Sequence, residues 1–231
     1  GSCAGTAYTC NDGLTCTACS GVPRLARLVR LLHRGRMAKL SIIYTSTREQ
    51  RAGTPIFKWF VEAAKAHGGF EVDEVDLQAI DLPLMNEPHH PRLQKYVHQK
   101  TKDWAALVAA SDAFVFVVPE YNYSLPPALL NALDFLFVEW NYKACAVVSY
   151  GGASGGLRST QAVRQMVINL KMMPITESVA VPFFTKQIEG DVFTPNEPQD
   201  KSVKPLLDEL VKVTKAPVSY THLTLPTSDL V

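Results

Sequence analysis

The most informative stretch of this chain is an unbroken apolar run, Ala113–Val118, that leads directly into a polar loop, Pro119–Tyr123. An uninterrupted run of this length is typical of a central parallel strand that helices cover on both faces. After the loop we expect a helix with Ser124 as its N-cap. Its apolar face comprises Leu129, Leu130, Leu133, Leu136 and Phe137. In an open α/β sheet, loops at the carboxyl ends of strands bind ligands, so this loop is a candidate binding segment.

Strands and amphipathic helices alternate along the rest of the chain. Four further strands are predicted, at Leu40–Tyr44, Phe70–Leu77, Ala144–Ser149 and Val179–Phe183. Helices are expected from Pro55, up to Ala110, after Gly156 and over Pro205–Val213. This alternation predicts one α/β domain with a parallel sheet and right-handed crossovers.

The charge balance excludes some classes of partner. The chain has 23 Lys and Arg against 22 Asp and Glu, a formal net charge of +1. This near-neutral balance gives no electrostatic reason to expect nucleic acid or an anionic membrane as a partner. No apolar run approaches the roughly 20 residues that a membrane-spanning helix needs.

The two ends of the chain differ from the segment between them. Four of the five cysteines lie in the first 19 residues, and residues 1–36 have no sustained hydrophobic period. A zinc ribbon normally has two C-x-x-C pairs, and this segment has one, so neither a metal site nor a disulfide framework is expected. We predict an unassigned extension over 1–36, one domain over 37–215 and an unassigned tail over 216–231.

The loop after the first strand is rich in groups that bind phosphate. It contains Ser46, Arg48, Arg51 and Thr54, and it ends at the start of a helix. Hydroxyls, guanidinium groups and the backbone N–H groups of a helix N-terminus suit a phosphate monoester. Taken alone, the loop is more simply interpreted as a solvated polar turn.

The loop after the fourth strand is rich in glycine, with Gly151, Gly152, Gly155 and Gly156 around Ser154. Glycines without side chains let the backbone approach a planar ligand. The same residues contain the G-x-S-x-G pattern of the α/β-hydrolase nucleophile elbow, which makes a serine hydrolase the alternative. Such a triad needs a later histidine, and His222 is the only histidine after this loop.

The segment from Pro119 to Leu136, PEYNYSLPPALLNALDFL, resembles the signature of the flavodoxin-like NAD(P)H-dependent FMN reductases. This family includes quinone, azo-dye and chromate reductases, and the resemblance extends over Met37–Lys215. It implies a three-layer fold with a five-stranded parallel sheet of order 2-1-3-4-5. It also implies that Pro119, Glu120, Tyr121 and Asn122 hold the flavin, together with Gly151, Gly152 and Ser154. The family pattern Gly-Ser-x-Arg is matched by Ser46 and Arg48, with Thr45 in place of the glycine.

The resemblance implies a function without a catalytic side chain, because the flavin carries the chemistry. NADPH or NADH would reduce bound FMN, which would then reduce a small-molecule acceptor such as a quinone, an azo compound, chromate or free flavin in a ping-pong cycle. A cytoplasmic homodimer or homotetramer is implied, with Trp140 and Tyr142 near a dimer contact. The alternatives are a flavodoxin-type electron carrier, which is usually strongly acidic, and a flavin-binding regulator without turnover.

Overall fold

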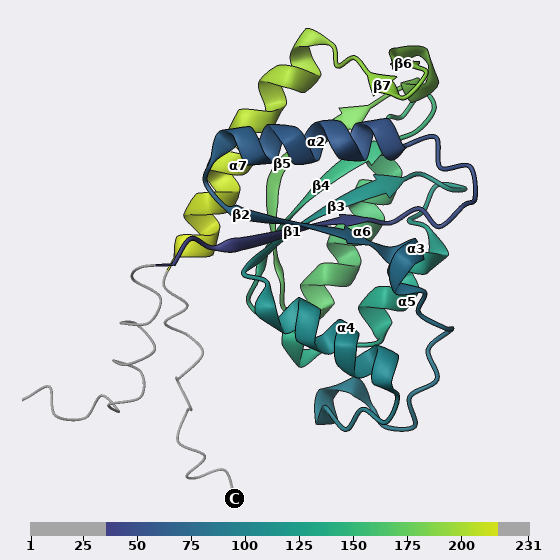
Figure 1. The fold of residues 1–231 in the computed structure, drawn as a ribbon, viewed down its shortest axis with the longest axis vertical. Helices are drawn as coiled ribbons and strands as arrows, with labels where there is room; N and C mark the ends of the chain where they lie inside the picture. Colours follow the sequence, from purple (N-terminus) through teal and green to yellow (C-terminus); the bar gives the residue numbers. More distant parts are fainter. Residues whose placement is uncertain (1–35, 217–231) are drawn as a thin grey trace, which may run out of the picture. The chain divides into compact units, whose positions relative to one another are not determined.

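Five parallel strands form one sheet at the centre of the fold (Figure 1). The computed structural model describes residues 36–216. The strands lie in the order β2-β1-β3-β4-β5, which confirms the predicted topology. Their bounds are β1 Lys39–Tyr44, β2 Glu71–Asp76, β3 Ala113–Pro119, β4 Ala144–Tyr150 and β5 Met173–Val181.

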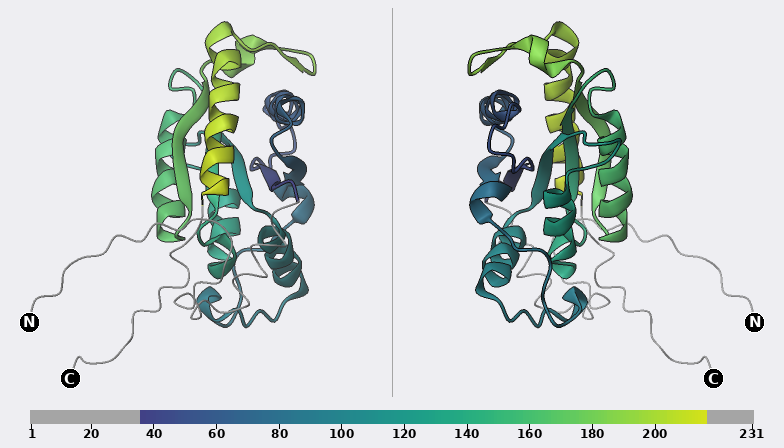
Figure 2. Two further views of the ribbon diagram at one scale, coloured as in Figure 1. Left: turned by 90° about the vertical axis from the view of Figure 1, so that its left-hand side faces the viewer. Right: turned by 90° about the vertical axis from the view of Figure 1, so that its right-hand side faces the viewer.

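Helices cover both faces of this sheet and make three layers (Figures 1 and 2). One face carries α2 (Thr54–His67) and α7 (Glu197–Lys215). The other carries α4 (Gln99–Ala110), α5 (Pro127–Asp134) and α6 (Leu157–Asn169). The short elements are α3 Leu77–Ile80, η2 Pro91–Leu93, η3 Val138–Trp140, η4 Phe184–Gln187, β6 Ile188–Glu189 and β7 Val192–Phe193. Among the described residues, no helix is both long enough and apolar enough to span a bilayer.

The sequence of β3 is apolar without interruption because this strand lies at the centre of the sheet and is buried on both faces. Successive side chains of a strand point to opposite faces. Val115 and Val117 pack into the core beneath α2 and α7, whereas Phe114 and Phe116 pack into the core beneath α4, α5 and α6. Every residue of β3 is buried, so a polar residue at any of these positions would lose its hydration on one face or the other.

The start of α5 differs from the prediction. Pro126 is the N-cap residue and no side chain caps this helix, so the prediction of Ser124 as N-cap was wrong. Ser124 instead exchanges two backbone hydrogen bonds with Tyr121, at 2.9 and 3.0 Å. This pair closes a two-residue turn, which places Ser124 too early in the chain to reach the first turn of the helix.

The last strand and the last helix are longer than predicted. Strand β5 begins at Met173 rather than Val179, and α7 begins at Glu197 rather than Pro205. A capping box explains the early start of α7, because the side chains of Asn196 and Gln199 each accept the other's backbone N–H.

Trp140 is completely buried and packs edge-on against Trp104 and Phe114, so its side chain offers no surface to a partner, and the expected dimer contact near Trp140 and Tyr142 stays a prediction. The large indole fills the core on the α4 side of the sheet.

The predicted division of the chain at 1–36 and 216–231 rests on residues that lie almost entirely outside the described range, and it stays a prediction.

Candidate functional site

A cleft of about 220 Å³ lies where the carboxyl ends of β1, β3 and β4 meet. Three of the sequence-predicted site residues, Thr54, Asn122 and Ser154, do not line it. The other eight do, and so do five residues that sequence analysis missed: Gln50, Ala52, Gly53, Tyr150 and Phe184. The eight predicted residues in the lining are Ser46, Arg48, Arg51, Pro119, Glu120, Tyr121, Gly151 and Gly152.

Thr45 does not obstruct the first loop. It is fully buried, and both its backbone N–H and its hydroxyl donate to the carbonyl oxygen of Val117, at 3.2 and 2.8 Å. These bonds extend the pairing of β1 with β3 by one residue. The threonine that replaces the expected glycine is therefore part of the sheet edge, and the loop begins after it.

The two arginines of the first loop have different surroundings. The Nη1 of Arg51 donates to both carboxylate oxygens of Asp76, at 2.6 and 2.7 Å, and its guanidinium lies 5.0 Å from the ring centre of Tyr44. Arg48 is exposed in the cleft, and among residues 36–216 no hydrogen bond or ion pair engages its side chain. Arg51 thus holds the loop to the end of β2, and Arg48 is the guanidinium available to an anion.

A cluster of buried hydroxyl groups lies under the same loop. Tyr150, at the end of β4, packs against Gly53 so closely that a Cβ at that position would lie 2.2 Å from the ring carbon Cζ. Its hydroxyl lies beside those of Tyr44 and Ser46, and Tyr44 is 3.3 Å from the hydroxyl of Thr54. Burial raises the pKa of both tyrosines, so their hydroxyls remain protonated at neutral pH.

Thr54 therefore supports the loop from below instead of lining the cleft. Its hydroxyl donates to the carbonyl oxygen of Arg51 at 2.8 Å. Thr54 was predicted to bind the phosphate, but its hydroxyl contacts Arg51 and Tyr44 and does not line the cleft. Helix α2 begins here, and its N-cap residue Gly53 lines the cleft with Arg48 and Ser46, so the positive end of the helix dipole faces the same cleft.

The loop after β3 is joined to its neighbours on both sides. The hydroxyl of Tyr121 lies 3.2 Å from that of Ser46, which links it to the first loop. The carboxylate of Glu120 accepts hydrogen bonds from the Ser154 hydroxyl at 2.8 Å, and from the Arg158 backbone and guanidinium at 3.1 and 2.8 Å. Burial alone would raise the pKa of Glu120, but these bonds hold it below its usual range.

The side chains of Glu120 and Ser154 thus bind each other, and the two loops are fastened together at that point. Both were predicted to bind a cofactor, and Glu120 still contributes to the cleft wall. Arg158 was not predicted, although a basic residue two positions after the last glycine of the loop could have suggested a partner for Glu120. Asn122 is exposed at the turn, away from the cleft lining.

The surroundings of Ser154 argue against the nucleophile elbow. A catalytic serine needs a histidine base within hydrogen-bond reach, whereas this hydroxyl donates to a carboxylate whose pKa is lowered. The candidate His222 lies outside the described residues.

We expect Ser154→Ala to keep most of the NAD(P)H oxidation rate, because its hydroxyl supplies one of three bonds to Glu120. The wild type should not react with a fluorophosphonate probe, as read by intact mass spectrometry. Stoichiometric labelling of Ser154 would support the hydrolase instead.

The residues of the cleft fit a planar ligand that carries a phosphate. Arg48 and the Ser46 hydroxyl can donate to a phosphate monoester, and the start of α2 adds the positive end of its dipole, although the N–H groups of Thr54 and Ile56 already donate to the carbonyl oxygens of Arg51 and Gly53. A Cβ added to Gly152 would meet nothing within 4 Å, so this side of the cleft is open above the backbone. Aromatic surface comes from Tyr121, Tyr150 and Phe184.

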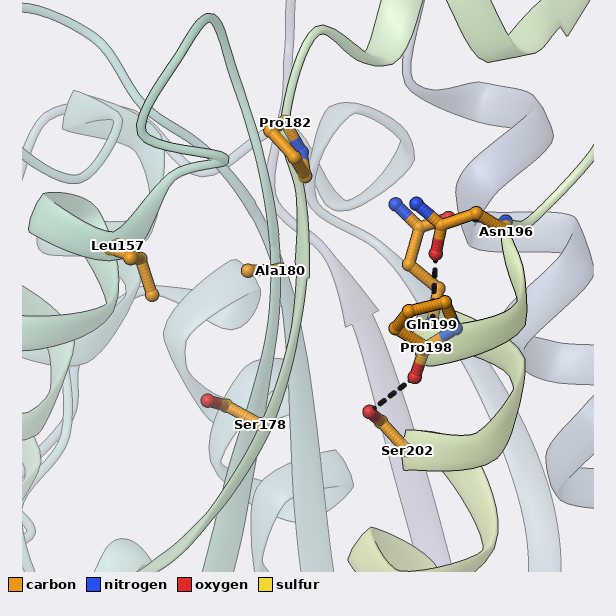
Figure 3. A pocket seen from close by; sticks show the side chains of 8 residues that line it. All are labelled: Leu157, Ser178, Ala180, Pro182, Asn196, Pro198, Gln199 and Ser202. Atoms are coloured by element: carbon orange, nitrogen blue, oxygen red, sulfur yellow. Dashed lines mark hydrogen bonds between the residues drawn. The ribbon is translucent and has the colours of Figure 1, made fainter.

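A second cavity, of about 350 Å³, lies between β5 and the start of α7 (Figure 3). Asn196 and Gln199 line it, and both are used in the capping box of α7. The Ser202 hydroxyl donates to the Pro198 carbonyl oxygen at 2.6 Å. The lining contains no titratable side chain, so this cavity offers no acid, base or cationic group.

The chain matches a family model and several curated proteins. The model described as NADPH-dependent FMN reductase matches residues 38–186. An NAD(P)H-dependent FMN reductase of Schizosaccharomyces pombe is 34% identical over 179 residues, which cover 77% of this chain and 82% of that protein. An NAD(P)H-dependent FMN reductase of Saccharomyces cerevisiae is 31% identical over 77% of this chain and 98% of its own length.

A solved structure supports the same fold. The flavoenzyme NAD(P)H:(acceptor) oxidoreductase FerB from Paracoccus denitrificans has a TM-score of 0.61 at 18% identity, covering 77% of this chain and 97% of that chain. A quinone reductase of Pseudomonas putida is 31% identical over 58% of this chain and 71% of its own length.

Proposed function

Since the chain belongs to the NADPH-dependent FMN reductase family, we propose that the cleft at the ends of β1, β3 and β4 is its FMN site. The chain is an oxidoreductase that uses FMN with NADPH or NADH. The chemistry that FMN supplies when bound is two-electron transfer from the nicotinamide to a second substrate. What remains for the protein is to bind the flavin, orient it and admit the two substrates in turn.

One observation carries the assignment of the site: Arg48, which has no partner among residues 36–216, lies with the Ser46 hydroxyl and the positive end of the α2 dipole in a cleft whose other wall is glycine-rich backbone. We assign Arg48 and Ser46 to the phosphate. Backbone groups of Pro119–Tyr121 and of Gly151 and Gly152 hold the edge of the flat ring, and Asn122, which does not line the cleft, follows them in the turn. Thr54 and Ser154 act behind this surface, through their bonds to Arg51 and Glu120.

The remaining contacts keep the cleft in shape. Arg51 fastens the first loop to Asp76, and Glu120 fastens the third-strand loop to Ser154 and Arg158. Loops held in this way lose little conformational entropy when a ligand binds, which favours affinity. No side-chain acid or base is assigned, because electron transfer through the flavin does not require one.

The physiological acceptor is proposed to be a quinone, with azo compounds, chromate and free flavin as further acceptors. Relatives named quinone reductases support this choice. We further propose that the chain works in the cytoplasm as a homodimer or homotetramer. The exposed apolar side chains of Leu130 and Val138, on and beside α5, are consistent with pairing through the helices near the cleft.

The absorption spectrum of the purified protein tests this proposal. We expect the bands of an oxidised flavin, and we expect them to bleach when NADPH or NADH is added under anaerobic conditions and to return when a quinone is added. Bound flavin that ignores both nicotinamides would support a carrier or a regulator. Failure to bind FMN at all would refute the assignment of the cleft.

A further inference from the structure

The tip of the loop after β3 has an unusual backbone. Tyr121 and Ser124 close a two-residue turn whose central residues, Asn122 and Tyr123, both have positive φ, at 49° and 67°. Turns of this kind favour Asn followed by Gly, because a side chain at the second position is strained. Asn122 fits that preference, but the bulky Tyr123 does not. Residues with such backbone strain are more frequent at functional sites than elsewhere in proteins.

Tyr123 is also exposed, although it is large and aromatic. The residue retains 69% of its accessible surface. The guanidinium carbon of Arg158 lies 3.9 Å from the centre of its ring, which places a cation over the ring at stacking distance. The guanidinium covers one face, and the exposure of the residue leaves the other available to a ligand. Neither core packing nor turn stability explains a tyrosine here.

Arg158 fixes the position of this ring relative to the cleft. Its Nη1 donates to Glu120 at 2.8 Å, and Glu120 lines the cleft. Glu120 also accepts the backbone N–H of Arg158 and the hydroxyl of Ser154, so the carboxylate is held from three directions. Among residues 36–216, no further hydrogen bond uses the other N–H groups of this guanidinium.

We propose that Tyr123, held by Arg158, is the stacking surface for the planar ring of the electron acceptor. The surface suits a quinone, because its flat, electron-poor ring can stack on the open face of the tyrosine while the guanidinium on the opposite face holds the tyrosine in place. This inference rests on the proposed function, because the surface has this role only beside a cleft that holds flavin.

Tyr123→Gly separates a functional tyrosine from a structural one. Glycine is the preferred residue at the second position of this turn, so the variant should be at least as stable as the wild type, with an unchanged or raised Tm. At the same time, kcat/KM for 1,4-naphthoquinone should fall about three- to tenfold, the range expected when one aromatic contact is lost. Tyr123→Phe, which keeps the ring, should retain the wild-type value.

Three measurements keep the interpretation specific. Calorimetric affinity for coumarin, a flat ring with a carbonyl that is not reduced, should fall in parallel with kcat/KM for the quinone. The affinity for FMN and kcat/KM for ferricyanide, an acceptor without a ring, should stay within twofold of the wild type. Tyr142→Gly is the matched control, because Tyr142 is also exposed, has a positive φ of 61° and lies near Lys171, but precedes β4 at the opposite end of the sheet. Tyr142→Gly should leave kcat/KM for both naphthoquinone and ferricyanide unchanged.

Unchanged naphthoquinone kinetics and coumarin affinity in Tyr123→Gly would overturn the inference. A lowered Tm with equal losses for naphthoquinone and ferricyanide would also overturn it, because that pattern indicates a structural residue. A wild-type protein that binds no FMN would refute the proposed function instead, and the flavin spectrum recorded first distinguishes the two failures.

Discussion

Gly53→Ala is expected to lower the free energy of unfolding by about 1–3 kcal/mol, the usual cost of forcing an extra methyl group into a packed site. The new Cβ would lie 2.2–2.6 Å from three atoms of the Tyr150 phenol ring. Gly53 has an ordinary helical conformation, with φ −84° and ψ 0°, so the backbone itself tolerates alanine. The clash with Tyr150 is therefore the whole cause, and chemical denaturation monitored by circular dichroism measures it.

The same variant should bind FMN more weakly, because Tyr150 can relieve the clash only by leaving the hydroxyl cluster beneath the first loop. The double variant Gly53→Ala/Tyr150→Ala provides the control, since its alanine at position 150 removes the clashing atoms. The double variant should be no less stable than Tyr150→Ala alone, which gives a coupling energy between the two positions. If the losses of stability in the two single variants simply add up in the double variant, the clash with Tyr150 is not the reason why alanine at position 53 destabilises the fold.

The order of the strands and the place of the cleft could be predicted from the sequence because both depend on short-range patterns. The apolar run of β3 can be covered on both faces only at the centre of a sheet. Because β1, β3 and β4 are adjacent and parallel, the loops that follow them meet at one edge of the sheet, whichever side chains they carry. Eight of the predicted site residues line the cleft for this reason.

The roles of individual side chains could not be predicted, because they depend on partners distant in the chain. Arg51 looks like a phosphate ligand until Asp76, 25 residues away, is placed beside it. Ser154 looks like a nucleophile until Glu120, 34 residues earlier, accepts its hydroxyl hydrogen. Trp140 gave no sign of being buried, because a sequence pattern does not show that Trp104 and Phe114 pack against it on the same face of the sheet.

Tyr150 shows the same limit at the scale of a single contact. Its sequence position, at the end of a buried strand, suggests only an aromatic residue near a binding edge. Its packing onto Gly53 depends on how the first loop approaches the end of β4. A glycine before a helix is usually interpreted as a backbone requirement, whereas here it makes room for a ring.

The two arginines of the first loop should respond differently to removal. Arg48→Ala is expected to weaken FMN binding by about 1.5–3 kcal/mol, the value of a hydrogen bond to a charged group, while riboflavin affinity stays nearly unchanged. Arg48 lines the cleft and has no partner among the described residues, so its loss should remove an interaction with the phosphate alone. Fluorescence titration with both flavins measures the difference.

Arg51→Ala is the matched comparison, because it removes the same charge from the same loop. Arg51 is bonded to Asp76 and lies over Tyr44, so its removal frees the loop from β2 and leaves a carboxylate without its partner. We therefore expect a lower Tm and similar losses for FMN and riboflavin. If Arg51→Ala instead spares riboflavin and Arg48→Ala weakens both flavins, the phosphate ligand is Arg51 and the assignment of the two residues must be exchanged.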